Sequence, residues 1–381
     1  MSKLVGVDIG STMVRVVELA GVNAEGFALI SRIGLAQLPR GAVIAGQVRE
    51  PKAVSTSLVR ALRDAGVARH GFVLGLTSPD ATITTMAFPA SVQRKERVDA
   101  IRTMNRPIAS TFGLEESSLA TYLAGATTAD DGSAMSTVGV AAARAEDVEA
   151  LNAVCAAARC SPQAIDLSGA GLLRGLARVN PLAPEISTVV DVGATKVTVA
   201  TRQGSYLRAL RTTVGAGDEI TQSLASAENI SFEEAEELKF GMALTDKRTG
   251  TADTPADPSA TYDLSGTEAR PSTSQDDPDL STLSVASDML VDAIAQSVEG
   301  GAAAVGSMTQ GVTLCGGTAL LRGFRGRLQQ RLGVPVSIAR PWAELEQSKR
   351  NRDYFHEGRP DPRLLLTLST AIGLALWKEP A

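Results

Sequence analysis

Residues that bind metal ions or form disulfides are scarce in this sequence of 381 residues. It contains two histidines and three cysteines, Cys155, Cys160 and Cys315, an odd number without the CxxC spacing of a zinc site. Both features argue against a structural zinc ion and against a disulfide framework. We therefore expect free thiols in a reducing compartment.

A strong net charge and a long apolar run are also missing. The formal net charge is -5, which gives no electrostatic reason to bind nucleic acid or an anionic membrane. The longest apolar stretch, LLLTLSTAIGLALW, is short for a membrane span and contains Ser and Thr, so we expect a buried core helix. Asp8 interrupts the apolar run near the start, which is not typical of a signal peptide. The sequence therefore predicts a cytoplasmic protein that meets a membrane only through a partner.

One short motif occurs twice. The segment LVGVDIGSTMVRVV, near the start, agrees in order with STVVDVGATKVTVA, in the middle of the chain. Each has a β-branched strand, a D-x-G turn and a second alternating strand, and so each predicts a β-hairpin. Because a chain of this length favours two domains, the repeat indicates that the two are related. The aligned pairs are Asp8 and Asp191, Gly10 and Gly193, Thr12 and Thr195, and Val14 and Val197.

The repeated turn has the composition of a phosphate-binding loop. Glycine allows backbone N–H groups to approach an anion, and the neighbouring hydroxyl groups add further donors. An aspartate before each turn would place two carboxylates beside the same phosphates, where they could hold Mg²⁺ through its bound waters. The sequence therefore predicts a nucleotide clamped between two related domains.

A weaker candidate lies in VTLCGGTALLRGF, where an apolar run ends in Gly316, Gly317 and Thr318. Paired glycines at the end of a strand suit the close approach of a ring or a phosphate. A tight turn between a strand and a helix explains them equally well.

Another weak candidate is the segment ENISFEEAEELKFG. Ser231 and Glu234 form a capping-box pattern, which predicts the start of a helix. On that helix Glu236 and Lys239 share one face. Such a pair alone is usually a solvated surface pair.

Taken together, the segments around Asp8, Asp166, Asp191, Gly316 and Ala371 resemble the five motifs of the actin-like ATPase superfamily. These motifs are phosphate 1, connect 1, phosphate 2, adenosine and connect 2. The opening VGVDIGSTMVRVVEL, the SFEEAEELK helix and the overall length are most similar to PilM-type proteins of type IV pilus assembly, relatives of the cell-division protein FtsA. The resemblance implies an α/β chain with the actin-like ATPase fold. Two ribonuclease H-like domains would surround a nucleotide cleft, with an extra subdomain inserted in the first.

The resemblance also implies ATP and Mg²⁺ as ligands. Asp8 and Asp191 would hold the metal ion through water, and Asp166 would orient an attacking water. Glu236 and Lys239 would reach the ribose. The other implied contacts to ATP are Gly10, Ser11, Thr12, Met13, Gly193, Ala194, Thr195, Lys196, Gly215, Gly217, Gly316, Gly317 and Thr318.

Some residues depart from the pattern of the superfamily. Met13 stands where small residues are usual, Arg15 replaces a common lysine, and Ala216 interrupts a frequent Gly-Gly pair. Met13 would narrow the phosphate site. We therefore expect binding of ATP with slow hydrolysis at most.

The same resemblance implies the domain boundaries. The first domain would comprise residues 1–84, 166–187 and 365–381, the inserted subdomain residues 85–165, and the second domain residues 188–364. Ser, Thr, Asp and Pro dominate residues 245–282, and apolar residues there are few. We expect a disordered loop in that segment.

The leading functional hypothesis is an ATP-binding adaptor at the inner face of the cytoplasmic membrane. The resemblance implies that the inserted subdomain binds the N-terminal cytoplasmic peptide of a PilN-like membrane protein, and it leaves self-association open. One alternative is a small-molecule kinase, although the sequence offers no separate motif for a substrate. Another is an FtsA-like filament protein, although LALWKEPA lacks a basic amphipathic anchor.

Overall fold

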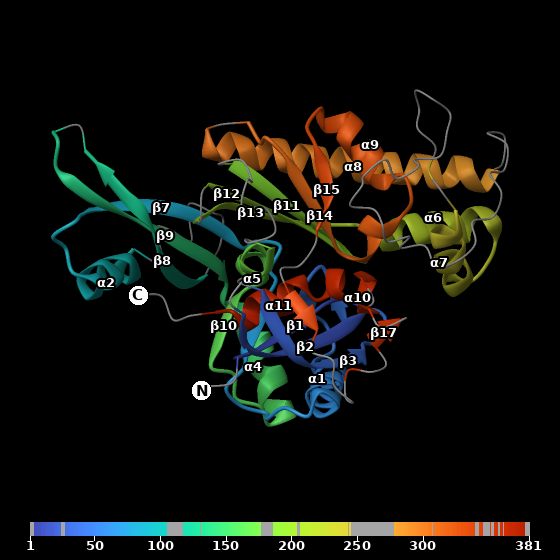
Figure 1. The fold of residues 1–381 in the computed structure, drawn as a ribbon, viewed down its shortest axis with the longest axis horizontal. Helices are drawn as coiled ribbons and strands as arrows, with labels where there is room; N and C mark the ends of the chain where they lie inside the picture. The colour runs from blue at the N-terminus through green and yellow to red at the C-terminus, as the bar shows by residue number, and fades with distance from the viewer. Residues whose placement is uncertain are drawn as a thin grey trace.

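The computed structural model contains two α/β domains, one above the other in Figure 1, and a smaller sheet to one side. It describes residues 4–23, 27–104, 117–129, 131–176, 186–203, 206–242, 244, 278–306, 308–339, 343–345, 351, 354–356, 359–360 and 362–377.

The first domain is built on a six-stranded sheet. In spatial order the strands are β10 (Ala164–Leu167), β6 (Val73–Leu76), β1 (Leu4–Ile9), β2 (Met13–Val22), β3 (Ala28–Gln37) and β16 (Ala343–Leu345). β1 and β2 are antiparallel, with Ile9 opposite Val14, so the first predicted hairpin is confirmed.

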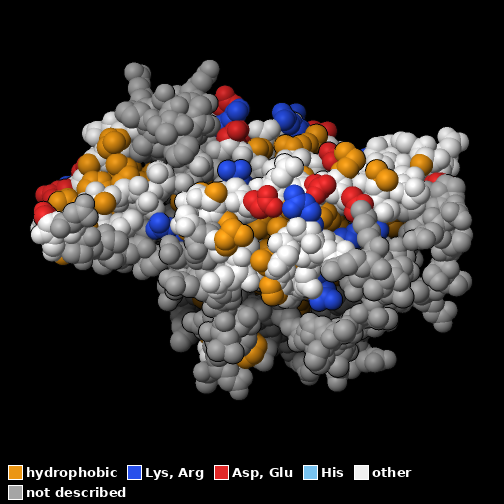
Figure 2. Space-filling view, turned by 90° about the horizontal axis from the view of Figure 1, so that it is seen from above, with side chains coloured by type: hydrophobic (Ala, Val, Ile, Leu, Met, Phe, Trp, Pro, Cys, Tyr) orange, Lys and Arg blue, Asp and Glu red, His pale blue; other side chains and the backbone are white. Residues whose placement is uncertain are grey.

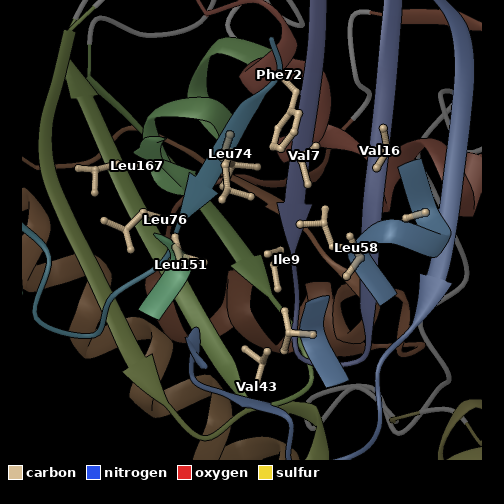
Figure 3. Packing of buried hydrophobic residues seen from close by; sticks show 14 of the residues in the cluster. Val7, Ile9, Val16, Val43, Leu58, Phe72, Leu74, Leu76, Leu151 and Leu167 are labelled. Atoms are coloured by element: carbon tan, nitrogen blue, oxygen red, sulfur yellow. The ribbon is translucent and has the colours of Figure 1, made fainter. Parts of the chain in front are cut away.

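One face of this sheet is covered by α1 (Pro51–Ala65). The helix begins with a proline at its first turn and ends at Gly66, whose φ of 64° suits glycine. Its buried side chains recur at helical spacing, and Leu58 packs with Val7 and Val16 of the sheet (Figure 3). This packing forms the larger part of the core of the first domain.

The opposite face of the sheet is covered by α5 (Ser168–Leu176) and α11 (Ser369–Ala375). Every residue of α11 is buried, which confirms the predicted core helix near the end of the chain. A Cβ atom at Gly6 of β1 would lie 2.1 Å from the carbonyl oxygen of Ala371. Glycine at position 6 therefore allows α11 to lie directly on the sheet.

The second domain repeats the hairpin within a five-stranded sheet. In spatial order its strands are β13 (Tyr206–Val214), β12 (Lys196–Gln203), β11 (Ile186–Val192), β14 (Val312–Cys315) and β15 (Val336–Ile338). Val192 lies opposite Val197, as Ile9 lies opposite Val14, so the second predicted hairpin is also confirmed. The helices of this domain are α6 (Gly217–Glu228), α7 (Phe232–Gly241), α8 (Pro278–Val305) and α9 (Phe324–Leu332).

The inserted subdomain is a three-stranded sheet with one helix, at the left of Figure 1. Its strands, in spatial order, are β7 (Thr82–Pro89), β9 (Ala134–Arg144) and β8 (Ser117–Thr128), and its helix is α2 (Arg94–Thr103). Ile101 of α2 is buried against Val138 and Val140. The inserted subdomain thus has a small core of its own.

Two domain boundaries in the structure differ from the predicted ones. The insert was expected to reach residue 165, but α4 (Ala145–Ala158) packs on α1, with Leu151 and Val154 buried in the core of the first domain. The second domain was expected to reach residue 364, but β16 adds to the first sheet, with Ala343 beside Ala28. Both errors have one cause, because an amphipathic helix or a short strand does not reveal which surface it packs against.

Most of the expected loop at 245–282 lies outside the described residues. Its last five residues are helical, since α8 begins at Pro278. Proline suits the first position of a helix because its missing N–H would have no partner there.

Helices α8 and α9 form a surface of mixed charge. Arg327 pairs with Asp288 at 2.9 Å, and Arg331 pairs with Asp292 at 2.7 Å and with Glu299 at 3.2 Å. Figure 2 looks onto this side of the molecule and shows acidic and basic side chains next to one another near the centre. Within the described ranges, no helix combines the length and the apolar character needed to cross a membrane.

The predicted capping box at α7 is present. Ser231 Oγ accepts a hydrogen bond from the backbone N–H of Glu234 at 3.2 Å, and the Glu234 carboxylate accepts from the backbone N–H of Ser231 at 2.8 Å. Ser231→Ala is expected to lower the free energy of unfolding by about 1 kcal/mol. Urea denaturation followed by circular dichroism measures the change. The control is Ser226→Ala on the exposed side of α6, and an equal loss in both variants would contradict a specific capping role.

Candidate functional site

The two D-x-G turns meet between the domains and have the same backbone geometry. The N–H of Gly10 donates to the carbonyl of Met13 at 3.0 Å, and the N–H of Gly193 donates to the carbonyl of Lys196 at 2.9 Å. A hydrogen bond between the Ser11 and Thr195 hydroxyls joins the turns. The predicted pairing of the turns across a cleft is therefore present in the structure.

A cleft lies beside the two turns. It receives side chains from both hairpins, from the end of β14 and from α5, α10 (Pro362–Thr367) and α11. Its lining is Asp8, Gly10, Ser11, Thr12, Arg15, Ser168, Leu172, Asp191, Gly193, Ala194, Lys196, Thr198, Cys315, Gly316, Gly317, Leu366, Thr367, Ser369 and Thr370.

Two carboxylates and two basic side chains face this cleft. Arg15 Nη1 lies 3.4 Å from Asp8 Oδ2. The Lys196 ammonium group comes from the second domain and donates to Thr77 Oγ1 of the first at 2.7 Å. Burial lowers the pKa of Lys196, while the charges of Asp8 and Asp191 oppose that shift. Burial likewise raises the pKa of Asp191, and Lys196 opposes it.

Several polar atoms of the cleft are buried and have no hydrogen-bond partner among the residues that the structure describes. They are Arg15 Nε, Ser168 Oγ and Thr198 Oγ1. The other contacts of Arg15 are long, at 3.4 Å to Asp8 and 3.5 Å to the carbonyl of Met13. Unpartnered buried donors are costly for a protein, which is typical of sites that await a ligand.

Gly316 brings the end of β14 close to the second turn. Its φ is 86°, and a Cβ atom there would lie 2.4 Å from Asp191 Oδ1 and 2.5 Å from the carbonyl oxygen of Val192. Glycine is therefore required at this position on both conformational and steric grounds. The predicted adenosine segment thus contributes Gly316 and Gly317 to the cleft.

Several predicted site residues stabilise the second turn through hydrogen bonds. The carbonyl of Gly193 accepts from the N–H of Gly217 at 3.2 Å and from Thr318 Oγ1 at 2.8 Å. The N–H of Gly215 donates to the carbonyl of Thr195 at 3.0 Å. Gly215, Gly217 and Thr318 are not part of the described lining of the cleft. Met13 and Thr195 are not part of it either.

Glu236 and Lys239 also lie outside that lining. The Lys239 ammonium group is buried and donates to Thr221 Oγ1 at 2.8 Å, to Glu236 Oε2 at 2.6 Å and to the carbonyl of Gly217 at 3.2 Å. Burial lowers the pKa of Lys239, and Glu236 opposes the shift. The pair fastens α7 to the start of α6, rather than forming the solvated surface pair that its spacing suggests. Contact with a ribose stays a prediction.

Asp166 lies in register with Gly75 of β6, the strand that also pairs with β1. Its carboxylate forms an ion pair with Arg174 and accepts from the N–H of Leu167 at 2.9 Å. It does not contribute to the described lining of the cleft. Its role in orienting water stays a prediction, and the salt bridge to Arg174 competes with it.

Sequence reasoning missed part of the cleft. Thr198 lies two residues beyond Lys196 in β12, so the alternation of the strand could have indicated it, whereas Ser168 begins helix α5 and had no such signal. Thr367 and Thr370 lie in the segment around Ala371 that resembles the connect 2 motif, but neither was named among the predicted contacts. Cys315 lines the cleft as a free thiol, and burial raises its pKa well above the usual value.

A family model described as type IV pilus assembly protein PilM matches residues 6–252, which is more than half of the chain. This chain belongs to the PilM family. A model of cell division protein FtsA matches residues 188–356.

Solved structures agree with this membership. The chain is 21% identical to a protein in a structure titled "PilM-PilN type IV pilus biogenesis complex", with a TM-score of 0.70, covering 98% of this chain and 97% of that one. It is 15% identical to ethanolamine utilization protein EutJ from Carboxydothermus hydrogenoformans, with a TM-score of 0.52, covering 99% of this chain and 90% of that one. The predicted actin-like ATPase fold is confirmed.

Proposed function

We propose that this PilM family member is a nucleotide-dependent adaptor of type IV pilus assembly. It binds ATP between its two domains and the N-terminal cytoplasmic peptide of a PilN-like membrane protein on its inserted subdomain. That peptide would hold the chain at the inner face of the cytoplasmic membrane, because no membrane-spanning helix occurs in the described part of the chain.

The nucleotide part rests on the unpartnered donors of the cleft. Arg15 Nε, Ser168 Oγ and Thr198 Oγ1 can each donate a hydrogen bond and have no acceptor among the described residues. A triphosphate chain is rich in acceptor oxygens and carries the negative charge that a guanidinium group favours.

The proposal assigns ATP the role of a bound regulator rather than that of a rapidly hydrolysed substrate. A general base must reach the attacking water, and the carboxylate of Asp166 is engaged by Arg174 and Leu167. The two carboxylates that face the cleft, Asp8 and Asp191, lie near Arg15 and Lys196, so turnover is expected to be slow.

The adaptor part rests on the inserted subdomain. Met86 and Phe88 are only partly buried against the small core formed by Ile101, Val138 and Val140. They leave apolar surface beside α2, which suits an extended peptide with a few apolar anchors. A free peptide loses conformational entropy on binding, so affinity in the micromolar range is expected, roughly -8 kcal/mol.

An FtsA-like filament protein remains the second candidate, because the FtsA model matches residues 188–356. The larger match to the PilM model favours the adaptor. Sedimentation of the chain with ATP separates the two hypotheses, since a filament would pellet.

The test is a titration of the chain into a fluorescent N-terminal peptide of the PilN-like protein encoded beside it, followed by anisotropy. The wild type is expected to bind, and Phe88→Ser is expected to weaken binding about tenfold or more, the loss expected for one apolar anchor. Val285→Ser, an exposed apolar site on α8 far from the insert, is the matched control and should bind as wild type does.

Thermal unfolding must first show that both variants are folded. Failure of the folded wild type to bind the peptide would overturn the adaptor proposal. Equal binding by a folded Phe88→Ser variant would remove the inserted subdomain from the interface. Deleting the whole predicted insert is unsuitable, because α4 contributes Leu151 and Val154 to the core of the first domain.

A further inference from the structure

The two copies of the turn motif differ in where they carry positive charge. In the first copy the residue after the turn is Met13, and Arg15 follows two positions later. In the second copy the aligned positions are Lys196 and Thr198. Each domain therefore contributes one basic side chain to the cleft, from a different position of the repeat.

Lys196 is held in place on both sides of the domain interface. Only 7% of the residue is exposed, and its ammonium group donates to Thr77 Oγ1 at 2.7 Å. Asp8 of the first domain and Asp191 of the second both lie close enough to affect its charge. Lys196 thus places its ammonium group near both carboxylates of the predicted clamp.

The donor set does not fit the magnesium ion that the sequence predicts. Mg²⁺ takes oxygen ligands in octahedral geometry and is usually held by one or two carboxylates together with water and substrate phosphates, so it would need carboxylates that are free of other cations. Asp8 already lies 3.4 Å from the Arg15 guanidinium group, and Lys196 stands near both aspartates.

Charge balance leads to the same conclusion. Arg15 and Lys196 already stand near the two carboxylates, so a divalent cation at this position would meet two positive side chains as well as two negative ones. A metal ion beside the aspartates would instead be repelled by two nearby cations, and this repulsion is strong where water is largely excluded.

We propose that Lys196, together with Arg15, supplies the positive charge that the paired aspartates would otherwise obtain from Mg²⁺, so that the cleft binds the triphosphate of ATP without a divalent cation. This inference rests on the proposed binding of ATP. It replaces the predicted metal-binding role of Asp8 and Asp191 with the role of orienting two basic side chains.

The test compares ATP affinity by isothermal titration calorimetry in 5 mM EDTA and in about 5 mM Mg²⁺, a concentration at which ATP is nearly all metal-bound. The wild-type affinity is expected to differ by less than about threefold between the two media, a free-energy difference below roughly 0.7 kcal/mol. Lys196→Met keeps the length of the side chain and removes its charge. It is expected to bind ATP about tenfold or more weakly in EDTA, the loss of one charge-assisted contact.

Lys196→Arg is the matched control, because it keeps the charge, and its loss in EDTA is expected to be smaller than that of Lys196→Met. Wild-type binding that requires Mg²⁺ would overturn the inference and leave the proposed binding of ATP intact. Absence of ATP binding in both media would overturn the proposed function and the inference together. The comparison of EDTA with Mg²⁺ uses the wild type alone and so does not depend on the folding of a variant. Thermal unfolding shows whether Lys196→Met and Lys196→Arg are folded.

Discussion

Replacement of Gly373 by alanine is expected to lower the free energy of unfolding by about 3 kcal/mol, the upper part of the range for overpacked cores. Gly373 lies in α11 where that helix crosses α5. A Cβ atom at this position would lie 1.6 Å from the carbonyl oxygen of Gly171 and 2.6 Å from the backbone nitrogen of Gly175. Backbone atoms of a helix cannot move aside as the end of a flexible side chain can. The two helices would have to separate.

Separation of α5 from α11 would also displace residues that line the cleft. Ser168, at the start of α5, and Ser369 and Thr370, at the start of α11, are part of its lining. Gly373→Ala is therefore expected to weaken ATP binding as well as stability. This connection makes the helix crossing a structural support of the site.

Urea denaturation and the calorimetric affinity for ATP measure the two effects. Gly241→Ala is the matched control, because nothing lies within 4 Å of a Cβ atom at Gly241 in α7. That variant is expected to change stability by less than about 1 kcal/mol, in either direction. Similar stability of the two variants would show that the helices can separate at little cost.

The repeated turn could be predicted from the sequence because its signals are local. Strand alternation, the D-x-G turn and the β-branched residues are all contained in a few positions, and the structure reproduces both hairpins with the same register. The duplication predicted the cleft, because two similar halves that each contain a phosphate-binding turn indicate a ligand site between them. The two related domains and most of the turn residues in the cleft follow from these features, whereas the fold class came from the resemblance to the actin-like ATPase superfamily.

The errors concern contacts between segments that are distant in the chain. Nothing in the sequence of α4 states that Leu151 packs on α1, and three residues of β16 are too few to carry a strand signal. Lys239 illustrates the same limit, because its spacing from Glu236 indicates a surface pair, whereas packing of α7 on α6 buries its ammonium group. The cation at Lys196 was placed among the contacts to ATP, but its pairing with Thr77 depends on how the domains close.

The last prediction concerns Arg15, whose guanidinium group is the least satisfied charged group of the cleft. Its Nε atom is buried without a partner, and its contacts to Asp8 and Met13 are long. In the presence of ATP the guanidinium group would donate to phosphate oxygens, and hydrogen bonds between charged groups contribute about 1.5–3 kcal/mol. Arg15→Met is therefore expected to weaken ATP binding by roughly 10-fold to 100-fold.

Two comparisons separate this role from a structural one. Arg15→Met alone leaves the buried Asp8 carboxylate without its cation, so the double variant Asp8→Asn/Arg15→Met removes both members of the pair and should bind ATP as weakly as the single variant if Arg15 contacts phosphate directly. Arg102→Met, on the exposed surface of α2, controls for the loss of one positive charge and should leave the affinity unchanged. Recovery of wild-type affinity in the double variant would mean that Arg15 serves only to neutralise Asp8, and the phosphates would then depend on Lys196 and the backbone of the two turns.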